Sequence, residues 1–197
     1  MPAERPGNRL FFALWPDEAT RAACAEAARV LRLRMQPRGA PSVAQRYHLT
    51  LLFLGDDVPE VAETAARQVA SHVRARPFTL RLDHAGSFRN REVPWWLGSR
   101  EPPPALSTLH ERLREALLRA RVPVQPMRFS PHLTIHRDAG APLPPTLIQP
   151  IEWPVRDFVL IRSHIGRAPV VYEQVGCWPL DPDAPEAAAG GGQMRLL

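Results

Sequence analysis

Residues 47–56 of the chain are YHLTLLFLGD, and residues 129–137 are FSPHLTIHR. Both stretches contain the same four-residue pattern of His, apolar residue, Thr and apolar residue, which begins at His48 and at His132. Successive side chains of a strand point to opposite faces. The pattern therefore predicts two strands that each present His and Thr on one face and apolar side chains on the other. The His-x-Thr spacing occurs nowhere else in the chain.

The segments around the two copies alternate between strand-like apolar runs and stretches with helical spacing. We predict strands at residues 9–15, 48–54, 78–85, 93–97, 129–136, 157–165 and 170–178. We predict helices at residues 17–34, 59–74 and 102–121. The Pro-rich residues 140–150 are predicted to form a loop, and residues 166–169 the turn of a closing hairpin.

The two copies start 84 residues apart, which fits a diverged internal duplication with one copy in each half. Sheets with helices on their outer side form an α+β fold. We predict an α+β domain over residues 1–180, in which strands from both halves line a central groove. Residues 181–197 are rich in Ala, Gly and Pro and are predicted to be a disordered tail.

Composition narrows the class of protein. A chain of 197 residues with 45% hydrophobic residues is ordinary for one globular domain. No apolar run approaches the roughly 18–20 residues that span a bilayer, so we expect a soluble, cytoplasmic protein without a membrane partner. Nothing in the sequence requires a dimer, and a monomer is expected. The two cysteines, Cys24 and Cys177, are far apart and are expected to be buried free thiols.

The basic residues are all arginines, 25 against 20 acidic residues, for a formal net charge of +5. The planar guanidinium group suits phosphate. The charge permits a nucleic-acid or phosphate-bearing partner without requiring one, because a bias toward Arg can also reflect a GC-rich genome.

The repeated pattern suits acid–base chemistry at phosphorus. The pKa of His lies near neutrality, so one imidazole can remove a proton from a nucleophile while the other protonates a leaving oxygen. A Thr hydroxyl on the same face can donate to a phosphoryl oxygen. We predict His48 and His132 as the catalytic pair, with Thr50 and Thr134 binding substrate. One such fragment is commonplace in strands, but two copies, one in each half, favour function.

A metal site is an alternative for the same region. Alternation would place His132, Thr134 and His136 on one face, where His48 could add a third nitrogen ligand. Neither a cysteine nor an acidic residue at close spacing completes such a site. We therefore predict no metal and no cofactor.

Together, the two motifs resemble the signature of the 2H phosphoesterase superfamily, and in particular the RNA 2′,3′-cyclic phosphodiesterases, long called 2′-5′ RNA ligases. Five blocks carry this resemblance across residues 9–180: RLFFALWPDEATRAA, YHLTLLFLGD, AGSFRNREVPWWLG, FSPHLTIHR and SHIGRAPVVYEQVGCWPL. The resemblance implies a bilobal fold with pseudo-two-fold symmetry, in which two antiparallel sheets with helices outside line a positively charged central groove. It also implies metal-independent opening of an RNA terminal 2′,3′-cyclic phosphate to a 2′-phosphate, with His132 activating water and His48 protonating the 3′ oxygen.

The resemblance further implies that Phe53 and Phe88 line the substrate site and that Arg137 closes the second motif. Strict alternation places Phe53 and Arg137 on the face opposite the histidines. Both therefore need a strand end or a β-bulge before them to reach the site. His136 departs from the family pattern, and it is either a third polar group in the groove or a spectator.

The expected partner is an RNA end, or a nucleotide, that bears a 2′,3′-cyclic phosphate. Two alternatives stay open. The same fold could join RNA halves through a 2′-5′ linkage, which needs no nucleotide cofactor because the cyclic phosphate carries the activation. A non-catalytic RNA-binding module is the other, although binding alone would not require two imidazoles.

Overall fold

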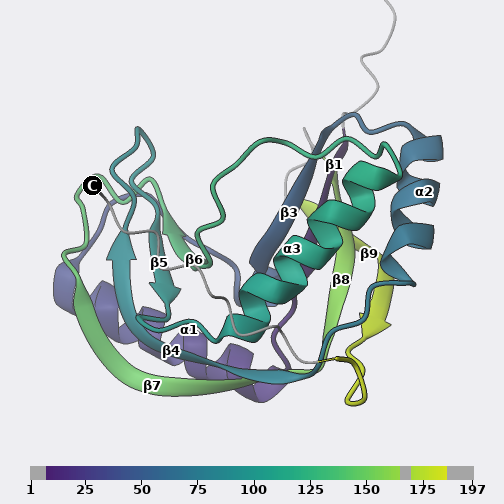
Figure 1. Cartoon of the computed structure of the whole chain (residues 1–197). Coiled ribbons are helices and arrows are strands. Elements are labelled where there is room, and N and C mark those ends of the chain that lie inside the picture. The colour runs from purple at the N-terminus through teal and green to yellow at the C-terminus, as the bar shows by residue number, and fades with distance from the viewer. Residues whose placement is uncertain (1–7, 165–169, 186–197) are drawn as a thin grey trace, which may run out of the picture.

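The computed structural model describes residues 8–164 and 170–185 (Figure 1). Its strands are β1 (Asn8–Leu14), β2 (Ala40–Pro41), β3 (Leu49–Asp56), β4 (Phe78–Ser87), β5 (Trp95–Gly98), β6 (Leu133–Arg137), β7 (Thr146–Val155), β8 (Asp157–His164) and β9 (Val171–Pro179). Its helices are α1 (Glu18–Met35), α2 (Glu60–Ala70) and α3 (Pro104–Arg119), with a short 3-10 turn at Ala44–Arg46.

The strands pair in the order β7-β4-β5-β6-β3-β1-β8-β9, and β2 adds to β6. All of these pairs are antiparallel. The two predicted sheets are joined at one residue pair, Leu49 opposite Leu133, so they form one continuous path. One lobe holds β4–β7, and the other combines β1 and β3 with the C-terminal β8 and β9 (Figure 1). The predicted α+β class with an antiparallel sheet is confirmed.

The helices pack against the sheet and against each other. Helix α1 packs on β7 and β6, while α3 packs on α2, β3 and β4 (Figure 1). Asp17 caps α1, because its carboxylate accepts the backbone N–H of Thr20 at 2.7 Å. The helix ends at Gln36, whose backbone is left-handed with φ 46°.

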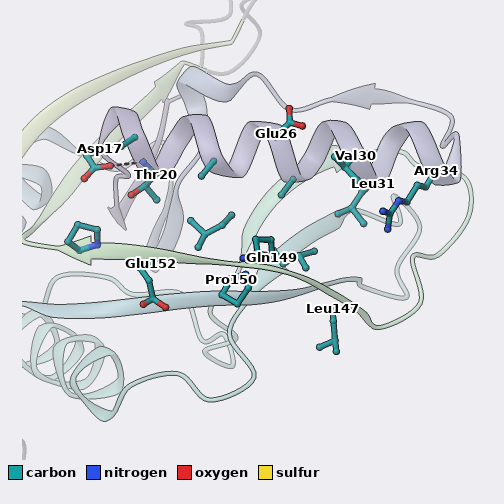
Figure 2. A pocket seen from close by; sticks show the side chains of 16 residues that line it. Asp17, Thr20, Glu26, Val30, Leu31, Arg34, Leu147, Gln149, Pro150 and Glu152 are labelled. Atoms are coloured by element: carbon teal, nitrogen blue, oxygen red, sulfur yellow. Dashed lines mark hydrogen bonds between the residues drawn. The ribbon is translucent and has the colours of Figure 1, made fainter.

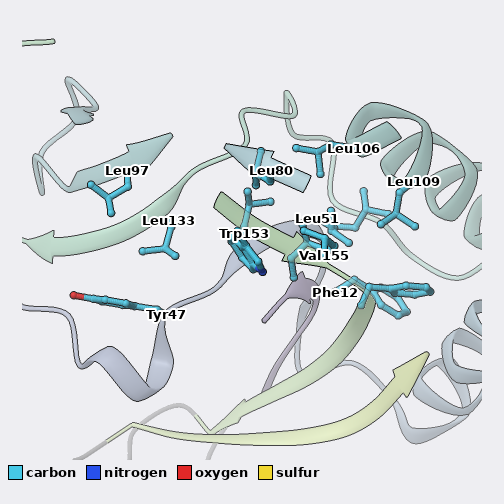
Figure 3. Close-up of a cluster of buried hydrophobic side chains, with 14 of the residues drawn as sticks. Phe12, Tyr47, Leu51, Leu80, Leu97, Leu106, Leu109, Leu133, Trp153 and Val155 are labelled. Atoms are coloured by element: carbon cyan, nitrogen blue, oxygen red, sulfur yellow. The ribbon is translucent and has the colours of Figure 1, made fainter. Parts of the chain in front are cut away.

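Every second residue of the RLFFALW stretch in β1 enters the hydrophobic core. Leu10, Phe12 and Leu14 point into the main core, where Leu51, Trp153 and other large side chains meet between sheet and helices (Figure 3). The alternate residues of β1 face the other way. Phe11 and Ala13 form a second apolar cluster with Val159 and Ile161. This second face of β1 is the one on which the His-Thr side chains lie.

The predicted loop at residues 140–150 is wrong from Thr146 onward, because β7 begins there and pairs with β4. The prolines misled the sequence prediction. Strand β7 is an edge strand, where a missing N–H is tolerated. Its pairing is also irregular between Leu147 and Ile151, so a widened segment accommodates Pro150.

The chain beyond residue 180 also differs from expectation. Asp181 forms an ion pair with Arg74, and the carbonyl oxygen of Ala184 accepts a hydrogen bond from Arg76 Nε at 2.5 Å. Ala184 is buried. Residues 181–185 therefore pack onto the domain, and residues 186–197 lie outside the described residues, as do residues 166–169 of the predicted hairpin turn.

The two thiols differ from each other. Cys24 lies on the buried face of α1, and burial raises its pKa to about 12. Cys177 is exposed, so the expectation of two buried thiols is wrong for this residue. No helix within residues 8–164 and 170–185 is long and apolar enough to cross a membrane.

Candidate active site

A β-bulge in β3 decides which side chains join Thr50 on the groove face. Ala13 of β1 pairs with Thr50, and Phe11 pairs with Phe53, so Leu51 is an extra residue in β3. Because Phe11 and Ala13 are two residues apart on a regular strand, their partners Thr50 and Phe53 share a face. The β-bulge that Phe53 needs before it in order to reach the site is therefore present.

A second bulge in β6 has the same effect on the second motif. Trp96 pairs with Thr134 and Trp95 with His136, which leaves Ile135 as the extra residue. Adjacent residues of β5 face opposite sides, so Thr134 and His136 do too. Arg137 then shares the groove face with Thr134. The predicted substrate residue Arg137 therefore reaches the same side as the motif.

His136 lies on the core side of the sheet. Its ring is 2% exposed and packs on Trp95 at 5.6 Å between ring centroids. Its Nε2–H donates to the carbonyl oxygen of Arg38 at 2.5 Å. His136 was expected to be either a third polar group in the groove or a residue with no part in it, and the structure supports the second. The metal alternative, which required His132 and His136 on one face, is wrong for the same reason, and the described residues hold no group of three His, Cys, Asp or Glu at ligating distance.

The two motifs meet where the lobes join. Strands β3 and β6 are antiparallel with Leu49 opposite Leu133. Extending that register by one residue places His48 across from Thr134. It also places Thr50 across from His132, and directly opposed residues have Cβ atoms about 4.5–5.5 Å apart. Each histidine thus neighbours the threonine of the other motif, which is the predicted pseudo-two-fold relation at its centre.

Both motif histidines hold the same tautomer through the same local contact. The Nδ1 of His48 lies 2.7 Å from the carbonyl oxygen of Arg46, and the Nδ1 of His132 lies 2.6 Å from that of Ser130. A carbonyl can only accept, so Nδ1 carries the hydrogen in each ring. The Nε2 atom is then the one that takes a proton when the imidazole is neutral and gives one when the ring is protonated.

Aromatic rings surround His48 and explain its electrostatics. Its ring centroid lies 5.0 Å from that of Phe11, 5.9 Å from Trp15 and 5.6 Å from Tyr172. This burial lowers the pKa of His48 to about 4, and the charges of Arg137 and His132 add to the effect. The neutral form of His48 is therefore dominant at neutral pH.

His132 is covered by an aromatic ring of its own lobe. The ring of Phe88 meets it edge-on at 4.7 Å. Burial lowers the pKa of His132, and the positive charge of Arg137 lowers it further. Arg137 thus acts on both histidines, although its own side chain is 54% exposed and lies 4.0 Å from Glu92.

A cavity of about 250 Å³ takes in three of the five predicted substrate residues, whereas Thr134, Arg137 and the predicted catalytic residue His48 do not line it. Thr50, Phe53, Phe88 and His132 line it together with residues of the segment before β6. The hydroxyls of Thr50 and Thr134 make no hydrogen bond within the described part of the chain, so both are free to bind a ligand. Phe53 also carries the guanidinium group of Arg9 over its ring at 5.5 Å.

Some residues of this site were not identified from the sequence. Phe11 and Trp15 share a face of β1 with Ala13, as the alternation in RLFFALW indicates. Because every residue of this run but Arg9 is apolar, the sequence gives no sign that one of its two faces lines the site and not the core. Tyr172 had no local signal, because the β8–β9 pairing brings it beside His48.

A larger cavity lies elsewhere. It has a volume of about 710 Å³ and lies between α1 and β7 (Figure 2). Its lining is mostly apolar, with Glu26 and Glu152 at its edges and none of the predicted site residues. Chemistry rather than size therefore identifies the candidate site.

Comparisons with known proteins show which family the chain is similar to. A family model described as the 2′-5′ RNA ligase superfamily matches residues 16–167. The RNA 2′,3′-cyclic phosphodiesterase of Escherichia coli K12 is 37% identical over 145 residues, which cover 72% of this chain and 80% of that protein. The protein of the same name from Thermus thermophilus is 37% identical over 177 residues, which cover 83% and 86%.

Solved structures show the same likeness. The crystal structure of E. coli LigT in apo form has a TM-score of 0.74 at 33% identity and covers 89% of this chain and 99% of that one. The structure of E. coli LigT complexed with 3′-AMP has a TM-score of 0.71 at 34% identity, with the same coverage.

Proposed function

The chain belongs to the 2′-5′ RNA ligase superfamily, and from this premise we propose that it opens a terminal 2′,3′-cyclic phosphate of RNA to a 2′-phosphate. Relatives that are 37% identical carry the name RNA 2′,3′-cyclic phosphodiesterase. The observation that carries the proposal is the pairing of Leu49 with Leu133, because its register, extended by one residue in each direction, sets His48 across from Thr134 and His132 across from Thr50 on one face. This arrangement supplies two proton carriers and two hydroxyls to one phosphate.

In the proposed reaction, Nε2 of His132 accepts a proton from water as the water oxygen forms a bond to phosphorus. The bond between phosphorus and the 3′ oxygen breaks, and His48, which enters the step in its protonated form, gives the proton on Nε2 to that oxygen. The product is a 2′-phosphate with a free 3′ hydroxyl. The contacts from both Nδ1 atoms to backbone carbonyls support these roles, since they leave Nε2 of each ring for proton transfer.

Other residues of the site are placed to stabilise the negative charge of the phosphate. Hydroxyls of Thr50 and Thr134 are placed to donate to the non-bridging oxygens, where negative charge develops in the transition state. Arg137 adds a positive charge close to both histidines. Phe53 and Phe88 offer ring faces to the terminal nucleoside in the adjoining cavity. Together these groups supply both proton transfers and the charge stabilisation, so we propose that neither a metal nor a cofactor takes part.

The direct test is hydrolysis of RNA ending in a 2′,3′-cyclic phosphate, measured in excess chelator. We expect turnover to survive chelation and to fall about 10²–10⁴-fold in His48→Ala and in His132→Ala. His72→Ala, which changes an exposed histidine after α2, is the matched control. Failure of the wild-type protein on this substrate contradicts the proposal, and loss of activity on chelation contradicts its metal independence.

The assignment of acid and base is tested separately. Removing a general base abolishes the acidic limb of the rate profile, and removing a general acid abolishes the basic limb. Profiles of residual activity in His132→Ala and His48→Ala should therefore lose opposite limbs. Loss of the basic limb in His132→Ala and of the acidic limb in His48→Ala would instead make His132 the acid and His48 the base.

Joining of RNA halves through a 2′-5′ linkage is the second candidate, favoured by the description of the family that matches. The same groups would catalyse it, with a 5′ hydroxyl replacing water. Incubation with paired RNA halves distinguishes the two, because ligation yields a longer RNA and hydrolysis a 2′-phosphate.

A further inference from the structure

We propose that a second pocket, beside the candidate active site, binds the nucleotide that precedes the cyclic phosphate in an RNA strand. This inference rests on the proposed function and specifies its substrate as RNA of two or more nucleotides. The pocket has a volume of about 380 Å³ and lies between β4, β5 and residues 142–145. The side chains of His84, Ser87, Arg89 and Trp96 line it.

Trp96 forms the floor of this pocket because two glycines make room for its ring. A Cβ atom on Gly86 would lie 2.8 Å from the indole, and one on Gly98 would lie 3.0 Å from it. The indole therefore lies across the backbone of both strands. Trp96 is also the cross-strand neighbour of Thr134, so the ring is on the groove face next to the second motif.

The position of this ring comes from packing. The indole N–H of Trp96 is buried and finds no acceptor among the described residues. The ring of His84 meets it edge-on at 5.1 Å between ring centroids. A half-buried aromatic ring held against glycines offers its free face to a ligand.

Phe88 connects the second pocket to the catalytic groups. Its ring lies 4.7 Å from that of His132 and 5.6 Å from that of Trp96. Phe88 lines the cavity shared with His132, while its chain neighbours Ser87 and Arg89 line the second pocket. Phe88 therefore contacts one lining residue of each cavity, so the two cavities are close neighbours, as adjacent nucleotides of a single strand require.

The chemistry of the lining matches a nucleotide. A base can stack on Trp96 whatever its identity, because every base has a π face. Arg89 is exposed at the rim and carries the charge that a connecting phosphodiester needs. No acidic side chain lines the pocket. The pocket thus fits one nucleotide of any sequence.

The test compares kcat/KM on a mononucleoside 2′,3′-cyclic phosphate with that on a dinucleotide bearing the same end. We expect the wild-type protein to prefer the dinucleotide by about five- to a hundredfold, the range for one stacked base. Trp96→Ala should bring this ratio near one, and Trp96→Phe should restore part of it. Arg29→Ala, which changes an exposed arginine of α1, should leave the ratio unchanged.

Gly86→Ala provides a variant in which the indole is kept but displaced. The new methyl group would occupy the space of the ring, so the dinucleotide preference should fall although every aromatic residue is present. The affinity for the product, a dinucleotide 2′-phosphate, measured by calorimetry, should fall in Gly86→Ala and in Trp96→Ala. This measurement needs no turnover, and thermal unfolding of each variant establishes that it is folded.

Two results overturn the inference. One is equal kcat/KM of the wild-type protein on the mononucleotide and the dinucleotide. The other is an unchanged ratio in both Trp96→Ala and Gly86→Ala. If neither substrate is hydrolysed, the proposed function fails instead, so the two failures are distinguishable.

Discussion

Leu49 of β3 and Leu133 of β6 face each other at the single residue pair that joins the sheets of the two lobes. Each leucine directly follows a motif histidine, and each is at most 1% exposed. The same pairing that places both leucines in the core turns both histidines to the groove. The distance between the two proton carriers is therefore set by a core contact.

This relationship predicts that Leu133→Ala affects both stability and rate. Truncation of a fully buried leucine costs about 2–5 kcal/mol in the free energy of unfolding, and it loosens the pair beside His132. We expect urea unfolding to show this loss and kcat to fall in the protein that remains folded. Leu147→Ala, at a position that is 68% exposed on β7, should change stability by only about 0.5 kcal/mol or less. Equal losses in the two variants would contradict the prediction.

The sequence predicted most of the strands and helices, and the two histidines and two threonines, because the alternation that places them is local to each motif. Three residues further along each strand, strict alternation failed. The extra residues Leu51 and Ile135 are visible only in the pairing of β3 with β1 and of β6 with β5. Register depends on neighbours distant in sequence, so a bulge cannot be located from one strand alone.

The consequences of the bulges explain the remaining differences at the site. Phe53 and Arg137 reach the groove, and His136 leaves it, because each follows a bulge. Tyr172 comes beside His48 through a strand pair, β8 with β9, that carries no motif. The fold class depended on periodicity, whereas these placements depended on pairing geometry.

The lowered pKa values of both histidines predict an acidic optimum for the proposed reaction. Catalysis needs one imidazole neutral and the other protonated, and kcat/KM reports the pKa values of the free protein. The pKa of His48 is about 4 and that of His132 is lowered from its ordinary value near 6.5. We expect a bell-shaped dependence of kcat/KM on pH with its maximum below about 6.5. A maximum well above neutrality would contradict these directions.

Arg137→Gln should change both the height and the position of that profile. Loss of a hydrogen bond to a charged group costs about 1.5–3 kcal/mol, which corresponds to a decrease in kcat/KM of about ten- to a hundredfold. Removing the positive charge also removes one cause that lowers the pKa of His48 and of His132, so the maximum should move to higher pH. The control is Arg29→Gln on α1. A fall in rate with no movement of the maximum would show that Arg137 does not act on the histidines.

The lowered pKa of His48 also predicts how the free energy of unfolding changes as the pH falls. Its pKa in the folded protein, about 4, is below the ordinary value of 6.5 that applies to the unfolded chain. Between these values the unfolded state binds more protons, so the stabilisation is complete above about pH 6.5 and is lost as the pH falls toward 4. The expected loss from this group is about 2 kcal/mol at pH 5. Urea unfolding of the wild-type protein at pH 7.5 and pH 5 should show it, and His48→Gln should reduce the difference. His72→Gln, at an exposed position, should retain the wild-type difference, and a His48→Gln protein with an unchanged dependence on pH would contradict the assignment.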